Sequence, residues 1–192
     1  MSHRIALALA LVSVGACRSA FTPTPANVAA WDRARQTLDF NADSNFGSES
    51  LRTGFTPDPW TFQLTAGGGT NPVNVADLGM VDAVTGEACT RSFVTRRPDF
   101  HFSFAAGAHF SLLRFYVVTA NGADATMVIN QPNAQWRCND DHHRGGWGHA
   151  TMPVIDFVNP QAGRYDIWVG SYDSSAHNEA TLYVTELDNN HP

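Results

Sequence analysis

The densest group of side chains that could do chemistry lies in residues 138–149, Cys-Asn-Asp-Asp-His-His-Arg-Gly-Gly-Trp-Gly-His. Asn139, Asp140 and Asp141 place oxygen atoms side by side, and Ca²⁺ takes about six to eight oxygen ligands. Asp173 joins them if its loop lies at the same end of the fold. The spacing is not that of an EF-hand. The same side chains also suit a turn that hydrogen-bonds its own backbone, so the run predicts either a calcium site or an acidic turn.

The histidines of this run raise the question of zinc. His142, His143 and His149, with Asp141 or Asp156, would supply three or four ligands of the kind that zinc prefers. Neither an H-E-x-x-H motif nor a Cys/His ribbon is present, and exposed loop histidines are the simpler interpretation. A metal-dependent hydrolase that uses the three histidines therefore stays as an alternative.

The sequence contains no other recognisable catalytic pattern. A G-x-S-x-G elbow, an S-x-x-K motif and a phosphate-binding G-x-x-x-x-G-K-[ST] loop are all missing. All of the basic residues are Arg, which removes chemistry that depends on Lys. We therefore expect a protein that is not an enzyme.

Two aromatic residues outside the expected strands are candidates for ligand binding. Trp147 lies in a Gly-rich stretch with no strand to pack from, and Tyr172 follows an apolar run. Such side chains suit contact with a glycan or a peptide, although packing over the fold is the alternative. The formal net charge of −6 and the absence of basic clusters argue against nucleic acid as a partner.

The first residues have the order of a secretory signal. A short basic start is followed by the apolar run 5–12 and then by small residues before Cys17. Residues 14–17, Val-Gly-Ala-Cys, are similar to a bacterial lipobox, which predicts a signal peptide at 1–16 and an acylated Cys17. Ordinary cleavage nearby, for instance after Ala20, is the alternative. Either version predicts an exported protein in the periplasm or at the cell surface, and a lipid anchor would hold it to a membrane.

Export also bears on the two remaining cysteines. Cys89 and Cys138 form an even pair in an oxidising compartment, and no C-x-x-C motif occurs. We expect them to form a disulfide, with free thiols or metal ligands as the alternative.

These candidate residues must be positioned by strands. Residues 17–55 are rich in Pro, Asn, Ser and Gly and predict a flexible tether, with one short helix over 28–38. From residue 56 to 188, short segments alternate apolar and polar residues between turns. The turn Asn121-Gly122 predicts a hairpin between 111–119 and 126–129. Without helices to cross between parallel strands, the pattern predicts an all-β fold, an antiparallel β-sandwich or jelly roll.

Three stretches carry a resemblance to a known family. They are Pro98-Asp99-Phe100, the run 136–141 (Trp-Arg-Cys-Asn-Asp-Asp), and 159–172, Asn-Pro-Gln-Ala-Gly-Arg-Tyr-Asp-Ile-Trp-Val-Gly-Ser-Tyr. They resemble small exported proteobacterial proteins that are similar to bacterial pre-peptidase C-terminal domains, and residues 180–187 resemble the last strand. The resemblance implies a jelly-roll sandwich, an ion site at Asp140, Asp141 and Asp173, and binding of matrix or polysaccharide. Such proteins often carry a serine peptidase label, which does not transfer because the chain has no peptidase domain.

Together these features predict an exported, lipid-anchored, non-catalytic module. We expect it to bind a glycan or an envelope protein through the loops around 139–149 and 171–178, with calcium as a stabiliser. A purely structural envelope protein is the further alternative.

Overall fold

The computed structural model describes residues 23–82, 86–90, 92–107, 111–142 and 147–192. The signal peptide expected at 1–16, the acylation of Cys17 and the position of His143 lie outside these residues. No helix among the described residues is both long and apolar enough to cross a membrane.

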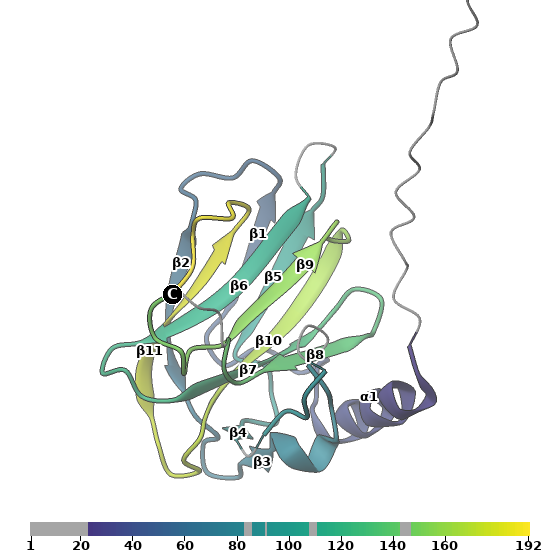
Figure 1. Cartoon of the computed structure of the whole chain (residues 1–192). Helices are drawn as coiled ribbons and strands as arrows, with labels where there is room; N and C mark the ends of the chain where they lie inside the picture. The colour runs from purple at the N-terminus through teal and green to yellow at the C-terminus, as the bar shows by residue number, and fades with distance from the viewer. Residues whose placement is uncertain (1–22, 83–85, 91, 108–110, 143–146) are drawn as a thin grey trace, which may run out of the picture.

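The described part of the chain forms two packed β-sheets (Figure 1). Sheet A has seven strands: β1 (Ser48–Arg52), β3 (Val73–Asn74), β4 (Phe93–Val94), β5 (Phe100–Ala105), β7 (Ala125–Asn130), β8 (Trp136–Asn139) and β10 (Gly163–Ser171). Sheet B has four: β2 (Trp60–Ala66), β6 (Leu112–Thr119), β9 (Val154–Val158) and β11 (Asn178–Thr185). The expected all-β sandwich is confirmed. Its strand pairs are antiparallel except that β1 runs parallel to β5.

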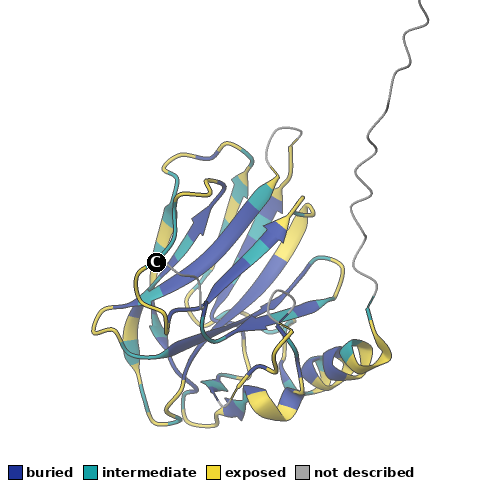
Figure 2. Ribbon diagram, in the orientation of Figure 1, coloured by how far each residue is buried: buried dark blue, intermediate teal, exposed yellow. Residues whose placement is uncertain are grey.

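The main core fills the space between the sheets. Phe100, Phe102 and Phe104 point inward from β5, while the residues between them point outward, as the period of two requires. Phe102 meets Phe115 of β6 edge to face, with ring centroids 5.4 Å apart. Figure 2 shows the buried residues concentrated along the facing strands. The alternation read from the sequence therefore identifies the residues of this core.

The loop at Asn121-Gly122 does not form the expected hairpin. Strand β6 pairs with β11 and β9 in sheet B, whereas β7 pairs with β10 and β8 in sheet A. The loop is closed by the Thr119 hydroxyl, which donates to the Ala123 carbonyl at 2.8 Å, and it carries the chain from one sheet to the other. Both flanking strands bury one face in the same core, so a crossing between the sheets satisfies the same apolar pattern as a hairpin.

The expected flexible tether is also corrected over residues 25–55. Helix α1 (Pro25–Thr37) confirms the short helix, with Thr24 and Asn27 forming a capping box at its start. The helix packs on the outer face of sheet A, together with the 3-10 helix η1 (Val75–Leu78), and forms a second core there. Strand β1 then extends the sheet. The helix folds because the outward face of β7, β8 and β10 is itself apolar.

This second core contains fourteen buried residues and lies at the lower right of the sandwich in Figure 1. They are Ala30, Trp31, Ala34, Leu38, Val73, Val75, Leu78, Met80, Cys89, Val94, Val128, Trp136, Cys138 and Trp168. The expected disulfide is confirmed: Cys89 and Cys138 are bonded, with Cα atoms 6.2 Å apart. The bond ties the segment before β4 to strand β8.

A buried carboxyl group holds the segment after α1 to the sheet. Asp99 is 1% exposed, and it accepts hydrogen bonds from the Asn45 side chain and from the Val169 backbone, both at 2.8 Å. Burial raises the pKa of Asp99 to about 7, and these hydrogen bonds act in the opposite direction. Folding of residues 38–47 onto the sheet is therefore coupled to the protonation of Asp99.

Candidate functional site

The loops predicted to bind a ligand meet at one end of sheet A. Strands β8, β7 and β10 are neighbours, and Asn139 ends the first, Ala125 begins the second and Ser171 ends the third. The backbone N–H of Tyr172 and the hydroxyl of Ser171 both donate to the Asp124 carbonyl at 3.3 Å. The sheet topology thus places the 140–141 and 171–173 loops on either side of Asp124.

Asp124 is a site residue that sequence reasoning missed. Burial, together with the nearby carboxylates of Asp140 and Asp141, raises the pKa of Asp124 to about 6. Its Oδ1 is buried and has no hydrogen-bond partner within the described residues. Mutual repulsion of three carboxylates makes this end of the sheet favourable for a cation and unfavourable for an anion.

Asn139, in contrast, is occupied by structural hydrogen bonds. Its side-chain oxygen accepts from the Val154 backbone at 2.7 Å. Its side-chain nitrogen donates to Asp82 Oδ2 at 3.2 Å and to the Asp141 carbonyl at 3.0 Å. The amide therefore fixes the loop between β8 and β9.

A small acidic cavity of about 40 Å³ lies beside the disulfide. Its lining includes four carboxylates together with Thr90, Asn139 and Cys89; the carboxylates belong to Asp82, Glu87, Asp140 and Asp141. The Thr90 hydroxyl donates to Asp140 Oδ2. The cavity has room for an ion or a few water molecules. These carboxylates are not arranged as metal ligands. Among the described residues, no three His, Cys, Asp or Glu side chains lie close enough together to hold one metal ion.

Asp173 forms a turn of its own. Its Oδ1 accepts from the backbone N–H and from the hydroxyl of Ser175, both at 2.9 Å. This is the Asx-turn interaction that was the alternative to ion binding for these loops. Tyr172, the residue before it, is 48% exposed and is among the large hydrophobic side chains that face solvent.

The loop histidines lie in different environments. His142 is 5% exposed, and its Nε2 forms a 3.0 Å hydrogen bond with the Gly148 carbonyl oxygen. His149 is exposed and has a φ of 52°. Since His142 is hydrogen-bonded to the loop backbone, the arrangement of the described histidines gives no support to a zinc hydrolase.

Trp147 packs against the rest of the fold. Its ring stacks on His191, with centroids 4.3 Å apart and planes 3° from parallel. The Arg114 guanidinium carbon lies 4.7 Å from the centroid of the same ring. Trp147 is therefore held against the outer face of sheet B, whereas Tyr172 belongs to the acidic end of sheet A.

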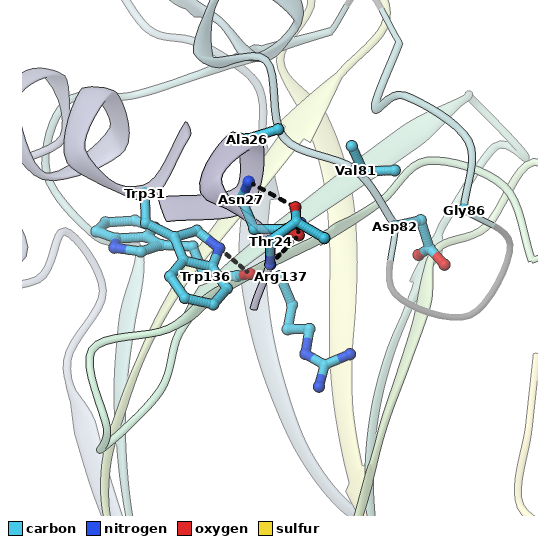
Figure 3. A pocket seen from close by; sticks show the side chains of 9 residues that line it. All are labelled: Thr24, Ala26, Asn27, Trp31, Val81, Asp82, Gly86, Trp136 and Arg137. Carbon is cyan, nitrogen blue, oxygen red and sulfur yellow. Dashed lines mark hydrogen bonds between the residues drawn. The ribbon is translucent and has the colours of Figure 1, made fainter. Parts of the chain in front are cut away.

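A larger cavity, of about 300 Å³, lies between the start of α1 and a wall that includes Val81, Asp82 and Gly86 (Figure 3). Trp31 and Trp136 form its apolar wall, and Asp82 and Arg137 are its charged residues. The start of α1 closes one side, where Thr24 and Asn27 hydrogen-bond each other. Burial lowers the pKa of Arg137, and the nearby Asp82 carboxylate counteracts that effect. Sequence reasoning missed this cavity because it treated residues 17–55 as a tether and gave the short helix expected at 28–38 no surface to pack against.

No family model matches the chain, and no curated protein matches it. Two solved structures are similar in fold. One is the pre-peptidase C-terminal domain of a collagenase from Bacillus anthracis, at 14% identity and a TM-score of 0.42, covering 76% of this chain and 99% of that one. The other is PliG, a periplasmic inhibitor of g-type lysozyme from Aeromonas hydrophila, at 12% identity and a TM-score of 0.30, covering 75% and 98%. The first belongs to the family that the sequence resembles.

Proposed function

We propose that the chain is an exported, lipid-anchored module without catalytic activity that binds a glycan or an envelope protein outside the cytoplasm. The observation that carries the proposal is the convergence of Asp124, Asp140 and Asp141 beside the exposed Tyr172. Exposed aromatic rings beside polar loops are typical of binding surfaces. Calcium at this acidic end would relieve the repulsion and order the loops that carry Tyr172.

The calcium part of the proposal is tested by thermal unfolding in EGTA, in excess Ca²⁺ and in excess Zn²⁺. A micromolar calcium site at millimolar calcium should stabilise the protein by about 4 kcal/mol, which raises Tm by several degrees. Asp140→Asn should abolish that increase, and Asp43→Asn, the same charge change on an exposed residue, should keep it. An unchanged Tm in calcium would contradict an ion site. Stabilisation by Zn²⁺ that is lost in His149→Ala would instead favour the hydrolase.

The binding part is tested by a screen of glycans and envelope proteins against the wild-type chain and Tyr172→Ala. We expect Tyr172→Ala to lose about tenfold or more in affinity for any true ligand of this end, because an exposed aromatic contact is removed. Ligands bound equally by both chains would contradict the assignment of Tyr172. The absence of any ligand would favour a purely structural envelope protein.

The lipid anchor is tested by expressing the chain with its N-terminal segment intact. Acylation of Cys17 predicts partition into a detergent phase, and Cys17→Ala should move the protein to the aqueous phase. Aqueous partition of both chains would contradict the anchor.

A further inference from the structure

A row of polar side chains crosses the outer face of sheet A beside strand β1. His101 of β5 is paired in register with Asp166 of β10, and Asp166 is paired with Asn130 of β7. The alternation that turns the phenylalanines of β5 inward turns His101 outward. Residues 41–46, here the latch, lie between α1 and β1 in the chain and contact this row through His101.

The Asp166 side chain accepts hydrogen bonds on both of its oxygens. It is 1% exposed. Its Oδ1 accepts from Arg164 Nε at 2.7 Å, and its Oδ2 accepts from the Asn130 side-chain nitrogen at 2.9 Å. A carboxylate that accepts on both oxygens has no proton to offer to the ring beside it. Nδ1 of His101, 2.8 Å from Oδ1, is therefore the donor in that contact.

The other ring nitrogen of His101 faces a second acceptor. Its Nε2 lies 3.1 Å from the Ala42 carbonyl oxygen, and a carbonyl group can only accept. Both nitrogens donate at once only in the doubly protonated, cationic ring. The neutral ring keeps one of the two bonds. Because the carboxylate of Asp166 is a stronger acceptor than a carbonyl group, the bond that is lost is the one to the latch.

The other end of the latch lies on a carboxyl group that also holds a proton. Asn45 donates from its side chain to Asp99 Oδ1 at 2.8 Å. Burial raises the pKa of Asp99 to about 7, while hydrogen bonds from Asn45, Val169 and Thr95 act in the opposite direction, and none of these partners is charged. Opening of the latch removes Asn45 and lets water solvate the ionised carboxylate. Ionisation of Asp99 therefore favours the open form.

The other charged side chains beside the latch and on the adjacent part of β1 include Arg96, Arg97, Arg164, Asp39, Asp43 and Glu49. Arg164 and Arg97 donate to the carbonyl groups of Phe40 and Asp43, at 2.9 and 3.0 Å. Arginine stays charged over the whole pH range in which proteins are studied, so these contacts do not change with pH. The side chains of Asp39 and Asp43 are exposed.

We propose that residues 41–46 are a pH-sensitive latch on sheet A, which is closed while His101 and Asp99 both hold a proton and opens locally when they lose it. Helix α1 and the second core stay in place when the latch opens. The open form exposes the paired side chains of His101 and Asp166 to solvent. The inference goes beyond the proposed binding function, and it involves neither calcium nor Tyr172.

The test is hydrogen exchange of the Asn45 and Phe46 N–H groups between pH 5 and 8.5, corrected for the intrinsic pH dependence of exchange. These groups donate to the carbonyls of Pro98 and Asp99, at 2.8 and 3.0 Å, so they report on the latch. Each proton released on opening raises the opening constant about tenfold per pH unit. The Asp39 N–H is the internal reference and should stay far more protected at every pH.

We expect two rises in the opening constant. From pH 5 to 6.5 it should rise about tenfold or more, because Asp99 ionises only in the open form. From pH 7 to 8 it should rise about tenfold again, because an unpaired histidine loses its proton at about pH 6.5 whereas the closed latch needs the cationic ring. His101→Gln should remove the second rise, and Asp99→Asn should remove the first. His177→Gln, the same change on an exposed histidine, is the matched control and should keep both.

Three results would overturn the latch: an opening constant that does not change with pH, equal protection of Asn45 and Asp39, or a rise above pH 7 that persists in His101→Gln. If Asp99→Asn does not fold, His101→Gln alone decides the matter. Failure of calcium or of Tyr172 ligands to bind would leave these exchange results unchanged, so the two proposals fail independently.

Discussion

The two sheets are covered on their outer faces in different ways. Sheet A is covered by α1 and the segment around η1, which bury Trp31, Leu38 and Cys89 against the strands. Sheet B is crossed at its end by residues 187–192. This segment is held mainly by hydrogen bonds to three of its backbone carbonyls, by the Asn190 side chain on Asp58 and Thr185, and by a stacked ring. Apolar burial of large side chains against one face contributes strongly to folding, whereas a few part-buried hydrogen bonds contribute about 1 kcal/mol each. The comparison teaches that the cover of sheet A, which includes α1, is part of the apolar core, whereas residues 187–192 are held on sheet B mainly by polar contacts.

Removal of the Trp31 side chain should have the largest effect on the free energy of unfolding. Trp31 is 8% exposed, and its indole N–H donates to the Trp136 carbonyl at 3.1 Å. Trp31→Ala should lower the free energy of unfolding by about 3–5 kcal/mol, since a large buried side chain leaves a cavity. Urea unfolding measures this, with Val28→Ala on the same helix as control; Val28 is 42% exposed and should matter by less than about 0.5 kcal/mol. Similar effects of the two variants would mean that α1 is only loosely attached.

The next largest effect should be a pH dependence of stability, which arises from Asp99 and the segment 38–47 that it holds to sheet A. The pKa of Asp99 is raised from 3.8 to about 7, so the folded protein keeps this carboxyl protonated where the unfolded chain has lost the proton. The resulting stabilisation is complete below about pH 4 and is lost as the pH rises to about 7. Asp99→Asn removes this titration. The free energy of unfolding of the wild type relative to Asp99→Asn should therefore fall by roughly 2–4 kcal/mol between pH 4 and 7.

Urea unfolding at a series of pH values measures that difference. A difference that stays constant with pH would show that Asp99 titrates alike in the folded and unfolded states. Asp43→Asn, at an exposed position of the same segment, is the control and should leave the pH dependence unchanged.

The C-terminal cover should give the smallest effect. His191→Ala removes one stacked ring, and we expect it to lower the free energy of unfolding by about 1 kcal/mol or less. Asn189→Ala, at an exposed position of the same segment, should lower the free energy of unfolding even less. A loss from His191→Ala as large as that from Trp31→Ala would make the two covers equivalent.

The sequence predicted most of the sandwich because period-two alternation marks strands with one buried face. Strands β2, β5 and β11 all follow that pattern. The helix α1 was expected, but its packing was not. The partner surface of α1, which includes Trp136 and Trp168, becomes a continuous apolar face only once β8, β7 and β10 are neighbours. Local patterns do not contain that information.

The candidate site was predicted in part for the same reason. Asp140 and Asp141 stand out as an acidic run, and the disulfide follows from counting cysteines. Asp124 was missed because its loop looks like a hairpin turn, although it joins two sheets. Arg114 lies in an apolar strand, and its role depends on the register that sets it beside Asp156. Loop composition indicates polar candidates, but pairing between strands decides which of them meet.

Backbone hydrogen exchange tests the difference between the two covers most directly. The Asp39 N–H donates to the Arg96 carbonyl at 2.8 Å in the N-terminal cover, and the Gly148 N–H donates to the Pro192 carbonyl at 3.1 Å in the C-terminal one. Our account predicts that Asp39 exchanges only with a free energy of opening close to that of global unfolding. It predicts that Gly148 exchanges through a local opening of far lower free energy. Equal protection of the two amides would contradict a C-terminal segment that opens locally, independently of the core.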